Sequence, residues 1–152
     1  GWEDGDEIIT TPITFVSTNH AVLYENMHAT FADVDEYLCI DPVDLEKKIN
    51  EKTKAVIFVG YGGRVGQLDK VIDICKKNGL RLILDAAHMS GTKVNGVCPG
   101  TWDGVDVTVY SYQAVKNLPT GDSGMICFKE AEDDKLARQL SWLGINKETY
   151  AR

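Results

Sequence analysis

Two continuous apolar runs with a helix-like segment between them constrain the fold of this chain more than any other feature. Residues 54–59 (Lys-Ala-Val-Ile-Phe-Val) and 80–84 (Leu-Arg-Leu-Ile-Leu) have the length and composition of strands buried on both faces. Residues 68–78 place apolar side chains on one helical face and end at Asn78-Gly79, a typical helix C-terminus. This order predicts a βαβ unit with parallel strands.

The same alternation continues through the rest of the chain. Asp41-Pro42 combines an N-cap residue with a proline at the first helical position, which predicts a helix that runs through Leu45 and Ile49. Further strands are expected at 7–12, 28–34, 106–111 and 124–128, and further helices at 15–25 and about 132–143. The predicted fold class is therefore α/β, with a mostly parallel sheet and helices on both faces.

Composition and charge argue against several classes of protein. The 152 residues are 43% hydrophobic and 26% charged, as in a globular domain with one core, and the net charge of −7 argues against a nucleic-acid surface. The sequence has no run of 18 apolar residues and no signal-peptide pattern at its start. Its three histidines and four cysteines are dispersed, so we expect no metal site and no disulfide framework, and the cysteines favour a reducing cytoplasm.

Polar residues follow three of the expected strands, at the sheet edge where ligands bind in such folds. They are Gly60-Tyr61-Gly62-Gly63, Asp85-Ala86-Ala87-His88 and the segment from Ser111 to Lys116. A loop lysine is by default a solvated charge, but this one shares its sheet edge with an aspartate. A carboxylate for a pyridine nitrogen, a lysine for an aldehyde and small donors for a phosphate together predict a pyridoxal phosphate site.

Five stretches of the sequence resemble one family of enzymes, in the same order along the chain. They are GDEIITTPITFVSTNHAVL (5–23), FADVDEYLCIDPVDLEKKINEKTKAVIFV (31–59), LILDAAHMSGTKVNG (82–96), VYSYQAVKNLPTGDSGMI (109–126) and LSWLGINK (140–147). These stretches are similar to segments of the DegT/DnrJ/EryC1/StrS family of sugar aminotransferases, such as D-A-A-[QH] and F-S-F-x-x-x-K-x-L-x-x-G-[DE]-G-G. The resemblance covers nearly the whole chain and implies the aspartate-aminotransferase (fold type I) large-domain core.

The resemblance implies a role for five residues. Lys116 matches the lysine that holds pyridoxal 5′-phosphate as a Schiff base, and Asp85 matches the partner of the pyridine nitrogen. His88 matches a glutamine or histidine beside the cofactor. Ser111 matches a phosphate-binding serine, and Phe15 matches the aromatic residue that stacks on the cofactor ring.

Four of these residues also have explanations that need no cofactor. Phe15 fits core packing, and Ser111 fits a strand-end hydroxyl bonded to the backbone. His88 fits a partly buried histidine with satisfied hydrogen bonds, and Asp85 fits a helix N-cap or turn aspartate. Their joint occurrence with Lys116 favours the cofactor site.

The resemblance implies a transaminase that moves an amino group from an amino acid, expected to be glutamate, to a nucleotide-linked keto sugar. Related dehydratases have histidine in place of the Schiff-base lysine, so Lys116 indicates transamination. Family members are dimers whose active sites lie at the subunit interface, which predicts a homodimer. The alternative is a non-catalytic fragment that folds but lacks a complete active site.

The sequence departs from the family pattern at two positions and lacks a match to two family segments. The family often has histidine where Gly60 stands, and Ser123 stands in a turn where glycine is usual. The Gly-Thr/Ser turn that binds the phosphate and the C-terminal small domain have no counterpart. We therefore expect residues 1–152 to form the central part of the large domain.

Overall fold

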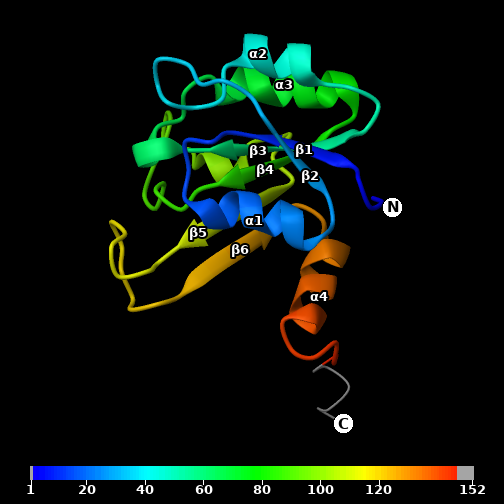
Figure 1. The fold of residues 1–152 in the computed structure, drawn as a ribbon. Helices are drawn as coiled ribbons and strands as arrows, with labels where there is room; N and C mark the ends of the chain where they lie inside the picture. The colour runs from blue at the N-terminus through cyan, green and yellow to red at the C-terminus, as the bar shows by residue number, and fades with distance from the viewer. Residues whose placement is uncertain (1, 147–152) are drawn as a thin grey trace.

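The computed structural model describes residues 2–146, which form one six-stranded sheet with the order β2-β1-β3-β4-β5-β6 (Figure 1). The strands are β1 (Glu7–Thr10), β2 (His28–Phe31), β3 (Thr53–Val59), β4 (Arg81–Asp85), β5 (Val107–Ser111) and β6 (Gly124–Phe128). The first five strands pair in parallel, and β6 pairs antiparallel to β5. The predicted α/β class with a mostly parallel sheet is confirmed.

Helices cover both faces of the sheet, as predicted. They are α1 (Val16–Tyr24), α2 (Pro42–Lys48), α3 (Leu68–Asn78) and α4 (Ala131–Leu140), with short 3-10 turns η1 (Tyr61–Gly63) and η2 (Pro99–Thr101). In Figure 1, α2 and α3 lie together on one side of the sheet and α1 lies on the other. Within residues 2–146, no helix has the length and apolar character needed to cross a membrane.

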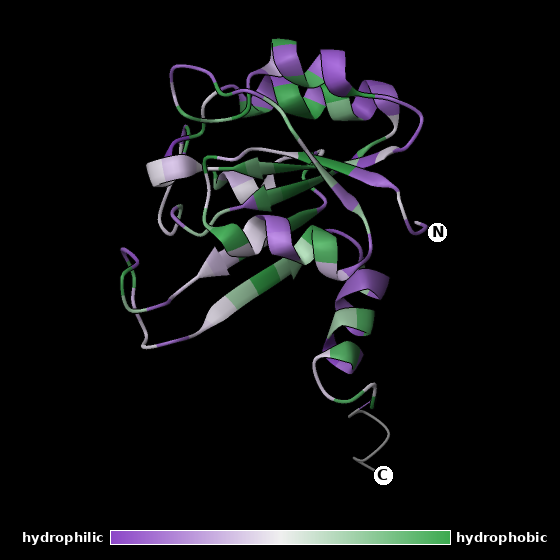
Figure 2. Ribbon diagram, in the orientation of Figure 1, coloured by the Kyte–Doolittle hydropathy of each residue, from purple (hydrophilic) through white to green (hydrophobic). Residues whose placement is uncertain are grey.

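The uninterrupted apolar run at 55–59 of β3 follows from the two layers that the strand touches. Val56 and Phe58 belong to the larger core cluster, which includes Leu68 of α3, whereas Ala55 and Ile57 belong to a second cluster around α1. Alternate side chains of a strand point to opposite faces, so both sets must be apolar. Figure 2 shows the hydrophobic residues concentrated on the central strands between these layers.

Both strands nearest the N-terminus are shorter than predicted. The strand expected at 7–12 is β1, which ends before Pro12 because proline has no N–H group to donate to the strand ladder. The strand expected at 28–34 is β2, which ends before Val34. Val34 instead forms a local antiparallel bridge with Ile40 as the chain turns towards α2.

Both predicted helix-terminus signals around the central βαβ unit are confirmed. Asp41 is the N-cap of α2 with Pro42 in the first turn, and Gly79 ends α3 with a left-handed φ of 65°. The predicted helix at about 132–143 corresponds to α4, which ends at Leu140. The chain then turns at Leu143, whose φ is 58°.

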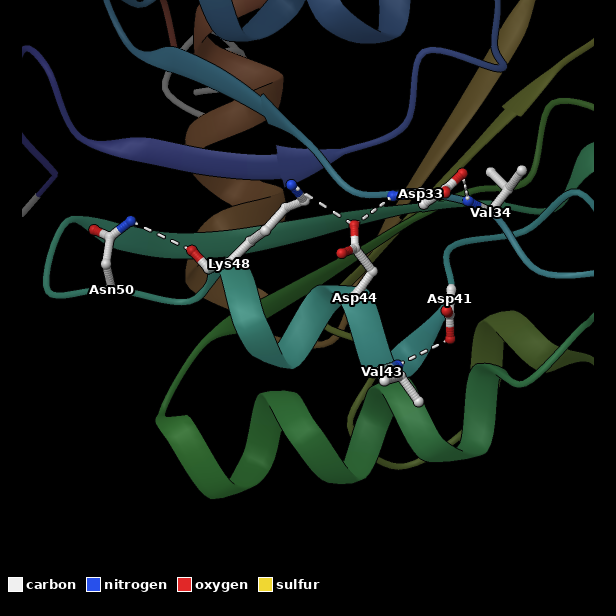
Figure 3. A network of polar contacts seen from close by, with 7 residues as sticks. All are labelled: Asp33, Val34, Asp41, Val43, Asp44, Lys48 and Asn50. Carbon is white, nitrogen blue, oxygen red and sulfur yellow. Dashed lines mark hydrogen bonds and ion pairs between the residues drawn. The ribbon is translucent and has the colours of Figure 1, made fainter.

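Aspartate side chains hold the start of α2 in place (Figure 3). The Asp41 side chain accepts a hydrogen bond of 2.9 Å from the Val43 backbone N–H. The Asp44 carboxylate accepts a 2.8 Å bond from the backbone N–H of Asp33 and lies 3.7 Å from the Lys48 ammonium group. The bond at Asp41 satisfies one of the N–H groups that a helix start leaves without an intrahelical partner.

We expect Asp41→Ala to lower the free energy of unfolding by about 1 kcal/mol, because it removes this capping acceptor. Urea denaturation of the full-length protein measures the change. Asp41→Asn keeps a capping oxygen and is the matched control. An Asn variant that loses as much stability as the Ala variant would contradict the capping explanation.

Candidate functional site

Three loops meet at the carboxyl edge of the sheet because β3, β4 and β5 are parallel neighbours. In the strand register, Asp85 at the end of β4 pairs with Val59 of β3 and Val109 of β5. The Gly60 N–H donates to the Asp85 carbonyl over 3.0 Å, and the Ala86 N–H donates to the Val109 carbonyl over 2.8 Å. The loops that follow the three strands therefore start side by side.

Four of the five predicted site residues line one pocket at this edge: Phe15, Asp85, His88 and Lys116. The remaining lining residues are Thr14, Val59, Gly60, Tyr61 and Ala87. The chain thus brings together an aromatic ring, a carboxylate, an imidazole and an ammonium group from three separate segments. This is the group of side chains that the sequence predicts for a pyridoxal phosphate site.

Two hydrogen bonds hold the Asp85 carboxylate, one at each oxygen. Oδ1 accepts a 3.1 Å bond from the Ala87 backbone N–H, and Oδ2 accepts a 2.7 Å bond from the Thr18 hydroxyl. The bond to Ala87 is the turn interaction that the sequence analysis gave as the alternative explanation for Asp85. The bond to Thr18 comes from α1 and fixes the carboxylate relative to a second element.

His88 accepts a hydrogen bond of 3.1 Å at Nδ1 from the Gly62 backbone N–H. The neutral ring therefore carries its proton on Nε2, which leaves Nε2 as a donor. Tyr61 meets the ring edge-on, with ring centroids 5.7 Å apart. Burial and the positive charge of Lys116 lower the pKa of His88, and the opposing effect of Asp85 is smaller. The hydrogen bond accepted at Nδ1 and the lowered pKa both favour the neutral ring.

Hydrogen bonds fix the loop on both sides of Lys116. The Lys116 backbone N–H donates to the Gln113 carbonyl over 2.8 Å, and the Gln113 side chain accepts a 3.0 Å bond from the Val115 N–H. The Asn117 amide donates to the Ser90 carbonyl over 2.7 Å, which links this loop to the segment after β4. Lys116 is partly buried, and among residues 2–146 its ammonium group has no carboxylate within ion-pair distance.

Phe15 and Ser111 differ in how they relate to the pocket. Phe15 is 74% exposed at the start of α1, so the core-packing explanation for this residue is wrong. Ser111 ends β5 outside the residues that line the pocket, and its hydroxyl accepts a long bond of 3.4 Å from the Gln113 N–H. Ser111 therefore has the backbone interaction that the sequence offered as its alternative.

Both departures from the family pattern have a local structural basis. A Cβ at position 60 would lie 2.1 Å from the Met89 sulfur, so the buried Met89 leaves no room for a side chain there. Ser123 is not one of the non-glycine residues with positive φ; the left-handed turn is at Gly121, with φ 101°. The serine hydroxyl contacts that of Thr120 instead.

Thr14, Thr18 and Asn117 are residues at this site that the sequence did not indicate. Thr18 follows Phe15, the N-cap residue of α1, by three residues, and this spacing is the one signal that could have indicated it. Asn117 directly follows the lysine, but its contact with Ser90 joins segments far apart in sequence. Among residues 2–146, all four cysteines are free and no three His, Cys, Asp or Glu side chains form a metal-binding group.

The matching family model is that of the DegT/DnrJ/EryC1/StrS aminotransferase family, over residues 1–152. The spore coat polysaccharide biosynthesis protein SpsC of Bacillus subtilis (strain 168) is 38% identical over 97% of this chain and 38% of its own length. The dTDP-4-dehydro-2,3,6-trideoxy-D-glucose 4-aminotransferase of Saccharopolyspora spinosa is 33% identical over 94% of this chain and 37% of its own length. The chain therefore spans less than half of the curated relatives that it matches.

Solved structures agree with this assignment. The aminotransferase TlmJ from Streptoalloteichus hindustanus superposes with a TM-score of 0.90 and 35% identity, over 97% of this chain and 40% of TlmJ. NtdA from Bacillus subtilis, solved with bound cofactor PMP, superposes with a TM-score of 0.81 and 27% identity, over 93% of this chain and 32% of NtdA.

The chain belongs to the DegT/DnrJ/EryC1/StrS aminotransferase family, and its sheet has the fold of the type I pyridoxal phosphate aminotransferases. Aminotransferases of this family use pyridoxal 5′-phosphate. The resemblance stated from the sequence is thereby confirmed for family, fold and cofactor class.

The lowered pKa of His88 predicts a pH-dependent share of stability. As the pH falls below about 6.5, His88 in the unfolded chain takes up a proton before the folded site does, so unfolding becomes easier. Relative to His88→Gln, the unmodified protein should lose stability between pH 7.5 and pH 5.5. Urea denaturation of both proteins at the two pH values measures the difference. A difference that stays constant or grows in favour of histidine at pH 5.5 would refute the neutral-ring assignment.

Proposed function

We propose that this chain forms the central part of a pyridoxal phosphate-dependent transaminase, which moves an amino group from glutamate to a nucleotide-linked keto sugar. The observation that carries the proposal is that Lys116 and Asp85 line one pocket, together with Phe15 and His88. The amino-sugar activity named for the Saccharopolyspora spinosa relative supports the substrate class. Glutamate is the donor that the family resemblance implies.

The residues of the pocket fit the parts of this cofactor. Lys116 has an ammonium group without an ion-pair partner among residues 2–146, so it is available to bind an aldehyde covalently. Asp85 presents a carboxylate with a fixed orientation for a protonated ring nitrogen. The exposed ring of Phe15 offers a stacking surface, and Nε2 of His88 offers a hydrogen bond.

Ser111 is proposed as a phosphate ligand on the strength of its position at the carboxyl end of β5 and its spacing before Lys116. Among residues 2–146, the side-chain hydroxyl of Ser111 makes one hydrogen bond, the long one that it accepts from the Gln113 N–H. Its hydroxyl proton is therefore free for a phosphate oxygen.

The bound cofactor supplies an electron sink for the substrate carbon, and the protein supplies orientation and proton transfer. The negative charge of Asp85 would stabilise a proton on the ring nitrogen. Lys116 would hold the cofactor covalently and, as a free amine, would serve as the base that moves the substrate proton. Lys116 has the amine for covalent attachment that a histidine at this position would lack. Its presence therefore favours transamination over dehydration.

We also propose a homodimer that works in the cytoplasm. Apolar side chains remain exposed on β6 and α4, among them Met125, Ile126, Leu136 and Leu140. Exposed apolar patches mark association surfaces, and the four free cysteines suit a reducing compartment.

Lys116→Ala should abolish the covalent adduct with pyridoxal phosphate and leave the fold intact, because Lys116 lies in a loop rather than in the core. The measurement is the visible absorbance of the adduct, and the mass of the Lys116 peptide after borohydride reduction. Lys93→Ala, which changes an exposed lysine after β4, should keep both signals. A Lys116→Ala protein that still forms the reducible adduct would remove Lys116 from this role. An unmodified protein that forms the adduct but transfers no amino group to keto sugars would support the non-catalytic alternative.

Asp85→Asn keeps the size of the side chain and its hydrogen-bonding capacity but removes the negative charge. The half-reaction with glutamate, which converts the pyridoxal form to the pyridoxamine form, should slow on the order of 100-fold or more, while the covalent adduct persists. Single-turnover absorbance on the full-length protein measures the rate. An unchanged rate would exclude Asp85 as the partner of the ring nitrogen.

A further inference from the structure

Two threonine hydroxyls, those of Thr14 and Thr18, are linked by hydrogen bonds to Asp85, and no role has been assigned to them above. The Thr18 hydroxyl donates to Asp85 Oδ2 over 2.7 Å, and the Thr14 and Thr18 hydroxyls lie 2.8 Å apart. Thr14 lines the pocket, whereas Thr18 does not. We infer that Thr18 is a positioning residue that fixes the Asp85 carboxylate towards the cofactor ring nitrogen, with Thr14 orienting the Thr18 hydroxyl. This inference rests on the proposed function.

The direction of the two hydrogen bonds follows from counting protons. A carboxylate only accepts hydrogen bonds, so the single hydroxyl proton of Thr18 must point at Asp85. Thr18 then has no proton left for Thr14, and Thr14 must donate to Thr18. The chain therefore runs in one direction, from Thr14 at the pocket through Thr18 to Asp85. Hydrogen bonds in such a chain strengthen one another.

The geometry of Asp85 explains why a second contact is needed. The terminal torsion of an aspartate is broad, so one hydrogen bond leaves the carboxylate plane free to turn. The bond from the Ala87 N–H fixes Oδ1, and the bond from Thr18 fixes Oδ2. With both oxygens held, the plane has one orientation relative to β4, and each oxygen keeps a lone pair for a further partner.

Thr18 is suited to this task by its own position. It lies in the first turn of α1, where its backbone N–H donates to the Phe15 carbonyl over 3.1 Å. A β-branched side chain in a helix has few rotamers, and the hydroxyl of threonine is therefore held more tightly than that of serine. Since Phe15 is the N-cap residue of the same helix, one short segment carries the exposed ring and the hydroxyl that holds the Asp85 carboxylate.

A purely structural role is the competing explanation, because the same bond joins α1 to β4. The two explanations differ in what the loss of the hydroxyl changes. A structural tie would lower the stability of the protein without cofactor. A positioning role changes the affinity for pyridoxal phosphate and the pH at which the bound cofactor changes its absorbance, because that pH reports the charge beside the ring.

The test compares Thr18→Val, which keeps the shape and removes the hydroxyl, with Thr18→Ser, which keeps the hydroxyl. Both are measured in the full-length protein by titration with pyridoxal phosphate and by absorbance of the bound form from pH 5 to pH 9. We expect Thr18→Val to weaken cofactor affinity about 10- to 100-fold and to shift the absorbance midpoint. Thr18→Ser should stay within about threefold of the unmodified affinity. Ser17→Ala, at the adjacent exposed position, is the matched control and should change nothing.

Two results would overturn the inference. One is a Thr18→Val protein with unmodified affinity and absorbance midpoint, whatever its stability. The other is a Thr18→Ser protein as impaired as Thr18→Val, since the hydroxyl would then not be the group that matters. If Thr18→Val fails to fold, Thr14→Val takes its place, and it should weaken affinity in the same direction by a smaller factor. If the unmodified protein forms no covalent Lys116 adduct with pyridoxal phosphate, the proposed function is wrong, and this inference, which rests on it, fails as well.

Discussion

Burial of residues 55–59 of β3 on both faces is the constraint on which the rest of the structure depends. A strand that exposes neither face to water must lie between layers of helix, and α1 on one side with α2 and α3 on the other provide those layers. Parallel pairing of β3 with β4 then puts their carboxyl ends at one edge. The pocket is a consequence of this arrangement, because Asp85 is the last residue of β4 and the loops after β3 and β5 begin beside it.

The sequence could predict those features that depend on local signals. The apolar runs, the Asp41-Pro42 start and the Asn78-Gly79 end each specify a structure within a few residues, and each agrees with the fold. The carboxyl-edge rule then places Asp85 and Lys116 together before any coordinates are known. The shorter first strands escaped prediction because the composition of 28–34 stays strand-like after the ladder has ended.

Features that depend on a contact between distant segments could not be predicted. The hydroxyl of Thr18 meets Asp85 only because α1 brings it to the carboxyl end of β4, and the three-residue spacing from Phe15 is the one local signal for this contact. The tautomer of His88 is fixed by the N–H of Gly62, which belongs to another loop. The exposure of Phe15 is likewise a tertiary property, since an aromatic residue in an apolar segment more often lies in the core.

The close approach of Gly60 to Met89 links two loops of the site in evolutionary terms. A histidine at position 60, common elsewhere in the family, needs the space that the Met89 sulfur fills, and Met89 is itself held in the core. A side chain at position 60 therefore requires the Met89 side chain to shift or to become smaller. A lineage that gains a side chain at 60 avoids placing two side chains in one volume if the side chain at 89 is repositioned or reduced first.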